Sequence, residues 1–272
     1  MLSHSLLVNT GNILSLSEAR LKASQNSTDE LIETLKIVLN DERSKGNDTT
    51  IVRIPVFGAI RECFSGAVDK FFCRLQLQIN GKRDTSLQDV DRKDLKVTVK
   101  VFISSPDVDS LKEALDQALE ALCTGTIESL VIAYKSAEGP EDILSSLKKI
   151  WSVVEEYVKA DKLSSVGLSD INTNTFIELF QWADVKPNIV QINLATCCVV
   201  PPVLQEFTKE NDIQLLTHSD PSQILPQEVL EKIFGSTAYL HWLIRYQIHL
   251  KCRGILSSKG YLLRINKSNV KP

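Results

Sequence analysis

Two hydrophobic periods alternate along the chain from residue 96 onward. Residues 96–103 end as an apolar, β-branched run, which predicts a strand, and residues 109–123 repeat apolar side chains with the three-and-four spacing of an amphipathic helix. The alternation continues toward the C-terminus. It predicts strands at 127–133, 164–168, 188–194, 213–217 and 254–257, and helices from Pro140 to Val158 and at 173–183, 202–211, 227–234 and 238–251.

The predicted strands are regularly spaced. Their ends at residues 103, 133, 168, 194 and 217 lie 30, 35, 26 and 23 residues apart, and each interval fits one βαβ unit. No pair of these strands is joined by the two-residue turn of an antiparallel hairpin. Because a parallel sheet must be covered on both faces, the pattern predicts an α/β fold, either an open doubly wound sheet or a closed barrel.

The first 95 residues have a weaker pattern. A small hairpin is predicted within residues 1–15, with Thr10-Gly11 at its turn. Ser27 and Glu30 have the spacing of a capping box, which predicts a helix that continues to Val38. Beyond it we expect a polar linker at 41–50, strands at 51–56 and 75–79, a helix at 58–72 and a charged surface loop at 80–95.

Composition limits the kind of protein. The 272 residues are 43% hydrophobic and 24% charged, as in a globular protein, and we expect one barrel-sized domain over residues 1–272. The formal net charge of −3 gives no electrostatic reason to bind nucleic acid or an anionic membrane. The N-terminus has no secretory signal pattern, and the apolar runs are far shorter than the ~20 residues that span a bilayer, which favours the cytoplasm.

The chain carries few motifs of catalytic or metal chemistry. It has no Gly-rich nucleotide-binding motif and no GxSxG nucleophile motif. Its six cysteines include no CxxC pair, and its four histidines are not spaced with them as zinc ligands, so no metal site is predicted. At the carboxyl ends of the predicted strands, only Tyr134 and His218 have an obvious proton-transfer role. Spacing assigns neither a partner, which favours a structural role for both.

Four segments of the second half carry a specific resemblance to a known family. They are Val166–Asp170, Gln181–Asn188, Gln191–Pro202 and Asp212–Pro221. Together they resemble the regulatory subunits of glutamate–cysteine ligase, the enzyme of the first step of glutathione synthesis. Shorter matches at 10–12, 245–246, 253–255 and 258–261 extend the resemblance over nearly the whole chain. It implies a non-catalytic protein that binds the catalytic subunit as a heterodimer, improves its use of glutamate and weakens feedback inhibition by glutathione.

That family is in turn similar to the aldo-keto reductases, which implies a TIM-type (β/α)8 barrel with an eroded N-terminal third. Reductases act with an aspartate, a tyrosine, a lysine and a histidine. Where the lysine and the histidine are expected, this chain has Ser104-Ser105-Pro106 and Ala133, and residues 50–95 contain no Asp-x-x-x-x-Tyr equivalent. The resemblance therefore implies a protein without reductase activity, with a divergent NADPH-dependent oxidoreductase as the alternative.

The cofactor side of the resemblance is half preserved. Reductases hold the amide of nicotinamide with Ser-Asn after the fifth strand and Gln on the sixth. The matching residues are Ser169, Asp170 and Gln191, and Asp170 replaces an amide donor by a negative charge. The basic phosphate-binding motif is blurred at Leu256–Lys259. We therefore expect no resident cofactor and treat these three residues as the remnant of a cofactor site.

Three cysteines are candidates for an intersubunit disulfide. Cys197 and Cys198 follow the strand predicted at 188–194 and fall in a loop on the carboxyl face of the barrel. Cys252 lies between Lys251 and Arg253, whose charges favour the reactive thiolate. The alternative for Cys197 and Cys198 is that they pack under their loop. The remaining cysteines, at 63, 73 and 123, are expected in or beside apolar helical stripes, where a free cysteine acts as a small hydrophobe.

Overall fold

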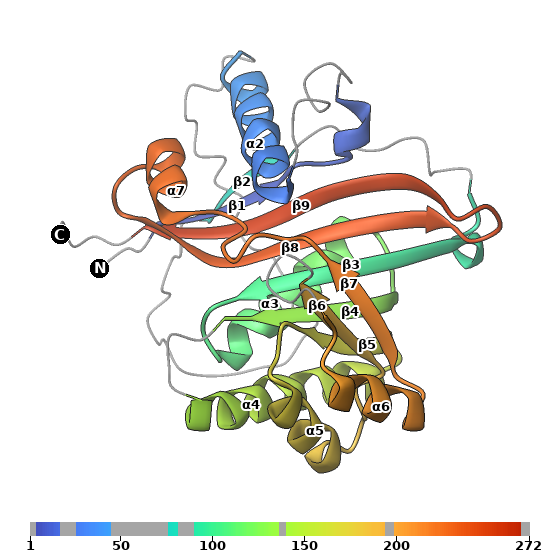
Figure 1. The fold of residues 1–272 in the computed structure, drawn as a ribbon. Helices are drawn as coiled ribbons and strands as arrows, with labels where there is room; N and C mark the ends of the chain where they lie inside the picture. Colours follow the sequence, from blue (N-terminus) through green and yellow to red (C-terminus); the bar gives the residue numbers. More distant parts are fainter. Residues whose placement is uncertain are drawn as a thin grey trace, which may run out of the picture.

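The computed structural model describes residues 4–16, 26–44, 76–80, 90–135, 140–193 and 199–267. Within these residues, nine strands form one sheet (Figure 1). Five of them follow one another both along the chain and in space, and each pairs in parallel with the next. They are β3 (Leu95–Ile103), β4 (Ile127–Tyr134), β5 (Leu163–Ser169), β6 (Ile189–Asn193) and β7 (Gln214–His218).

Four helices alternate with these strands and cover one face of the sheet (Figure 1). They are α3 (Val108–Ala121), α4 (Pro140–Lys159), α5 (Thr173–Trp182) and α6 (Pro202–Glu210). Because the order from β3 to β7 never reverses, each right-handed crossover returns its helix to the same side. This is the arrangement in the wall of a TIM-type barrel, and it confirms the α/β class and the βα alternation predicted for this part of the chain.

The core under these helices follows the two-residue period of β3. Val97, Val99 and Val101 are buried on the helix-covered face, and Lys100 lies on the opposite face because side chains alternate along a strand. Trp151 of α4 is fully buried in the same core, and its Nε1 donates a hydrogen bond to the carbonyl oxygen of Val185 at 2.8 Å. One face of the parallel strands is thus apolar, and the other is left to carry polar side chains.

The helix predicted at 238–251 is wrong. These residues form β8 (Ala238–Leu250), and the strand predicted at 254–257 is only the beginning of β9 (Ile255–Lys267). The two strands form a long antiparallel hairpin, and β8 also pairs antiparallel with β3. Gly254 lies in the turn between them with φ +61°, a conformation that favours glycine.

The physical reason is the period of the apolar side chains in β8. Trp242, Ile244, Tyr246 and Ile248 alternate with other side chains and are buried in the same core as the helices α3 to α6. These residues are aromatic or β-branched, which favours a strand over a helix. The two-residue period is therefore the stronger signal in this segment, although the same residues also satisfy a helical pattern.

The hairpin predicted within residues 1–15 is wrong as well. The first part is β1 (His4–Asn9), but Ile13–Ser15 form a short 3-10 helix instead of a second strand. β1 pairs antiparallel with β9 and parallel with β2 (Gln76–Asn80), so its partners are remote in sequence. Asn12 explains the difference. Its side chain donates to the carbonyl oxygen of Ser257 and accepts from the N–H of Lys259, which ties the turn to β9.

The predicted helix is confirmed as α2 (Ser27–Ser44), which takes in the start of the predicted linker. Its capping box is not confirmed, because Asn26 Oδ1 accepts from the first backbone N–H groups, whereas Ser27 bonds Asp220 and Glu30 bonds Lys259. Together with α7 (Gln227–Phe234), it covers the face of β8 and β9 opposite to α3, and Leu31, Leu35 and Leu230 form a second core there (Figure 1). The strand predicted at 75–79 is β2. The elements predicted at 51–56 and 58–72 lie outside the described residues, and part of the loop predicted at 80–95 is a 3-10 helix at Arg92–Asp94.

The complete strand order is β2-β1-β9-β8-β3-β4-β5-β6-β7. The regular βα repeat thus occupies one half of the sheet, and the β8–β9 hairpin joins it to the N-terminal strands. In the part of the chain that the structure describes, no helix is both long and apolar enough to cross a membrane.

Candidate functional site

The carboxyl ends of β3 to β7 surround a cavity of about 610 Å³. Ser104 after β3, Ala133 near the end of β4, Ser169 at the end of β5 and His218 at the end of β7 all line it. The loop that follows β7 and the first residues of β8 complete the wall. Parallel α/β folds place their chemistry at this edge of the sheet.

A buried lysine occupies the polar face of β3 beside this cavity. Lys100 is only 5% exposed, and its Nζ donates hydrogen bonds to Ser169 Oγ at 3.1 Å, Gln191 Oε1 at 2.7 Å and Asp220 Oδ2 at 2.9 Å. An ammonium has three N–H donors, so these contacts use all of them. Burial lowers the pKa of Lys100, and the charge of Asp220 opposes that shift.

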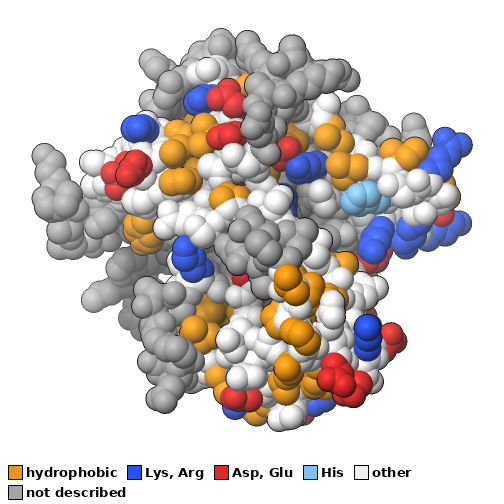
Figure 2. Space-filling model, viewed as in Figure 1, with side chains coloured by type: hydrophobic (Ala, Val, Ile, Leu, Met, Phe, Trp, Pro, Cys, Tyr) orange, Lys and Arg blue, Asp and Glu red, His pale blue; other side chains and the backbone are white. Residues whose placement is uncertain are grey.

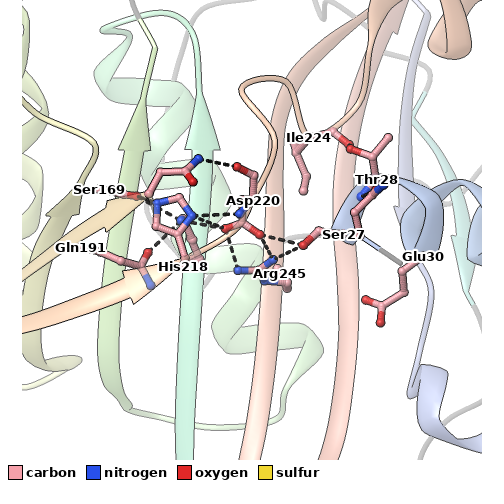
Figure 3. Close-up of polar contacts among 12 residues, drawn as sticks. Ser27, Thr28, Glu30, Ser169, Gln191, His218, Asp220, Ile224 and Arg245 are labelled. Atoms are coloured by element: carbon pink, nitrogen blue, oxygen red, sulfur yellow. Dashed lines mark hydrogen bonds and ion pairs between the residues drawn. The ribbon is translucent and has the colours of Figure 1, made fainter. Parts of the chain in front are cut away.

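Asp220 lies at the centre of the polar contacts (Figure 3). In addition to the hydrogen bond from Lys100, its carboxylate accepts two from Arg245 of β8, with Nη1–Oδ1 at 2.5 Å and Nη2–Oδ2 at 2.9 Å. It also accepts one from Ser27 Oγ, at the start of α2, at 2.7 Å. Burial alone would raise the pKa of Asp220, but hydrogen bonds from His218 and Arg245 hold it well below its usual range. One carboxylate therefore joins strands and a helix from both halves of the sheet.

His218 bridges two carboxylates. Its Nε2 lies 2.9 Å from Asp170 Oδ2, and its Nδ1 lies 3.2 Å from Asp220 Oδ2. Burial acts to lower the pKa of His218, but the hydrogen bonds with Asp170 and Asp220 outweigh it and raise the pKa above its usual value. The same contacts lower the pKa of Asp170 against the effect of its burial. The two carboxylates stabilise the charged form of the ring, whereas the backbone N–H of Asp220, which lies 3.1 Å from Nδ1, donates to that nitrogen in the neutral ring.

The structure brings together the three residues predicted as a cofactor remnant. Ser169 and Gln191 pair across β5 and β6, and both oxygens contact Lys100. Asp170 follows Ser169, with φ at +59°, and its carboxylate accepts a hydrogen bond from Ser169 Oγ at 3.0 Å. Tyr134 also lines the cavity. Its hydroxyl is buried and has no hydrogen-bond partner among the described residues.

The candidate disulfide cysteines are only partly described. Cys197 and Cys198 lie outside the described residues. Cys252 is an exposed free thiol in the turn between β8 and β9, at the end of the molecule where basic side chains gather (Figure 2). Cys123, expected in or beside an apolar stripe as a small hydrophobe, lies just after α3 but is exposed, in a left-handed turn with φ at +48°.

Sequence reasoning missed Lys100, Asp220 and Arg245. Each had a local signal. Lys100 stands between two valines in β3, Arg245 stands among apolar residues of β8, and Asp220 comes two residues after the end of β7. A charged residue within a buried strand is rare unless it is paired. Among the described residues, no group of histidine, cysteine, aspartate and glutamate side chains is arranged to hold a metal ion.

Comparison with known proteins places this fold and site in a family. No protein-family model matches the chain. The human glutamate–cysteine ligase regulatory subunit is 33% identical over 276 residues, which cover 97% of this chain and 94% of that protein. Glyoxal reductase of Bacillus subtilis is 25% identical over 146 residues, which cover 53% of this chain and 50% of the reductase. An aldo/keto reductase structure from Brucella melitensis matches 54% of this chain and 56% of its own with 18% identity and a TM-score of 0.42. Since the similarity to the human protein spans almost the whole of both chains, this chain belongs to the family of glutamate–cysteine ligase regulatory subunits.

Proposed function

We propose that this chain binds the catalytic subunit of glutamate–cysteine ligase as a heterodimer and raises its efficiency in the cytoplasm. The similarity to the human regulatory subunit over 97% of this chain carries the proposal. The expected effects are better use of glutamate and weaker feedback inhibition by glutathione. Physically this is linkage: binding of the regulatory chain favours a conformation of the catalytic subunit with a different affinity for each small molecule.

The contacts of Ser169, Asp170 and Gln191 support a role without a nicotinamide cofactor. In the reductases the matching residues face the amide of nicotinamide. Here the oxygens of Ser169 and Gln191 accept hydrogen bonds from Lys100, and the carboxylate of Asp170 is bonded to His218. These residues therefore do not fit that amide. A titration that follows NADPH fluorescence separates the two functions, because the divergent reductase requires saturable binding.

The first prediction concerns assembly and kinetics. We expect the chain, co-expressed with the catalytic subunit, to co-purify with it, to lower its KM for glutamate and to raise the glutathione concentration needed for inhibition. The catalytic subunit alone and the same subunit mixed with an active aldo-keto reductase serve as controls. A catalytic subunit that purifies alone, or whose glutamate and glutathione dependence is the same with and without this chain, would contradict the proposed function.

A second prediction concerns the cysteines. We propose Cys197, Cys198 or Cys252 as this chain's side of an intersubunit disulfide that reinforces the heterodimer under oxidising conditions. Exposure of Cys252 supports its candidacy. Non-reducing electrophoresis of the oxidised complex is expected to show a covalent band that the combined Cys197→Ser, Cys198→Ser and Cys252→Ser variant loses. Cys123→Ser, which removes another exposed thiol, is the matched control. A band of full strength in the triple variant would exclude these thiols.

A further inference from the structure

We propose that the cavity at the carboxyl ends of β3 to β7 binds an uncharged small molecule with an apolar body. The proposal goes beyond the regulatory role and concerns this chain by itself. The cavity volume of about 610 Å³ lies within the roughly 300–1,000 Å³ of small-molecule sites. Two features of the wall carry the proposal, namely its apolar side chains and the pairing of its charged groups.

One wall of the cavity is a row of side chains across three neighbouring strands. Phe102 of β3 pairs with Ala133 of β4, which in turn pairs with Ser169 of β5, and all three residues line the cavity. Because the side chains of paired residues lie on the same face of a sheet, this row presents an aromatic ring, a methyl group and a hydroxyl together. The small side chain of Ala133 leaves space above the middle strand.

The other half of the sheet and its connections supply a second apolar wall. Ile224 and Leu225, between β7 and α7, and Leu240 of β8 line the cavity. Tyr239, which also lines it, is 46% exposed. A ligand that covers such exposed apolar surface removes it from water, and this is a favourable contribution to binding. The ligand would lie between the two halves of the sheet and contact both.

The charged groups of the wall are already paired within the chain. All three N–H donors of Lys100 are used there, one of them by Asp220. Asp170 is paired with His218 at 2.9 Å. Lys135 lies at the exposed rim of the cavity, where its Nζ donates to a backbone carbonyl oxygen at 3.2 Å. The two lysines and the two carboxylates of the wall balance each other.

This pairing favours an uncharged ligand. An ion that enters the cavity loses hydration, and Lys100 and Asp220, the charged groups deep in the wall, are already bonded to each other and to further partners. An uncharged molecule gives up much less hydration on entry. Ser104 and Gln223, both exposed in the wall, offer an uncharged hydroxyl and carboxamide for a polar group of such a molecule.

A charge series on one ring system tests the proposal. 2-Naphthalenemethanol, 2-naphthoate and 2-naphthylmethylammonium share the apolar body and differ in charge. Binding to the wild-type full-length chain, measured by calorimetry and ligand-observed NMR, is expected to be saturable for the alcohol and at least about tenfold weaker for each ion, a factor that corresponds to about 1.4 kcal/mol. Equal or tighter binding of either ion, or no saturable binding of the alcohol, would overturn it.

A matched pair of variants locates the bound alcohol. Ala133→Phe fills the cavity from the middle of its sheet wall and is expected to weaken binding by about tenfold or more, because the ring occupies space that the ligand needs. Ala121→Phe places the same ring at the exposed end of α3, outside the cavity, and should leave the affinity unchanged. Equal affinities of the two variants would place the bound molecule elsewhere and overturn the proposal. If Ala133→Phe does not fold, nuclear Overhauser effects between the alcohol and the Phe102 ring of the wild-type chain decide the location, and their absence would overturn it.

Discussion

Replacing Asp220 with asparagine is expected to lower the free energy of unfolding by about 3–5 kcal/mol, the range measured when one partner of a buried ion pair is removed. The variant keeps the shape of the side chain but removes the carboxylate that the buried Lys100 and Arg245 share. It also weakens the contact with Ser27 of α2, so both halves of the sheet are affected. Denaturant unfolding followed by circular dichroism measures the change.

Two comparisons make this prediction specific. Lys100→Met removes one of two cations and leaves Asp220 paired with Arg245, so we expect a smaller loss of about 1–3 kcal/mol. Asp184→Asn removes an exposed carboxylate that lies 3.7 Å from Lys159 and should change stability by no more than about 1 kcal/mol. If Lys100→Met proves as destabilising as Asp220→Asn, the carboxylate is not shared in the way that the distances indicate.

The pH dependence has a defined sign. The pKa of Asp220 is lowered in the folded state, so its contribution to stability is complete above its unfolded pKa of about 3.9 and is lost as the pH falls toward the folded value. The pKa of His218 is raised, so its contribution is complete below its unfolded pKa of about 6.5 and is lost as the pH rises through the folded value. The difference between the wild type and Asp220→Asn is therefore expected to shrink below about pH 4.

The parallel half of the sheet could be predicted from the sequence because its signals are local. β3 and β4 contain short apolar runs, and α3 between them repeats its apolar residues on one face. Both periods are present within about fifteen residues. Strands that are neighbours in this half of the sheet also follow one another along the chain. The order of the predicted elements therefore also gives the order of the strands in the sheet.

The other half could not be predicted in this way because its contacts are remote. β1 pairs with β9, which lies at the far end of the chain, and with β2, from which it is separated by a long intervening segment. The residues of β8 fit both a two-residue and a helical period, and the choice between them is made by pairing with β3 and β9. Such tertiary contacts override local propensity.

The candidate site shows the same difference between local signals and remote contacts. Ser169, Asp170 and Gln191 were singled out through a family resemblance, and the structure brings them together. Lys100 and Asp220 are separated by 120 residues, and no local spacing indicates that they form an ion pair. A lysine inside an apolar strand signals that a partner exists, but the fold is needed to identify it.

The second large effect is expected at Gly167 in β5, two residues before Ser169. A Cβ atom at this position would lie 2.0 Å from the carbonyl oxygen of Ile189, the residue paired with Gly167 in β6. The obstacle is backbone, which cannot turn away as the end of a flexible side chain does. Glycine within a strand commonly marks such a close approach of two backbones.

Gly167→Ala is therefore expected to destabilise the fold by about 3 kcal/mol or more, at the upper end of the cost of overpacking. β5 and β6 would have to separate, which would also displace Ser169 and Gln191 from Lys100. Gly125→Ala is the matched control, because a Cβ atom there meets nothing within 4 Å. Thermal unfolding should show a Tm lower by roughly 6–12 °C for the first variant and nearly unchanged for the second. Equal Tm values for the two variants would mean that β5 and β6 do not approach each other as closely as the backbone positions indicate.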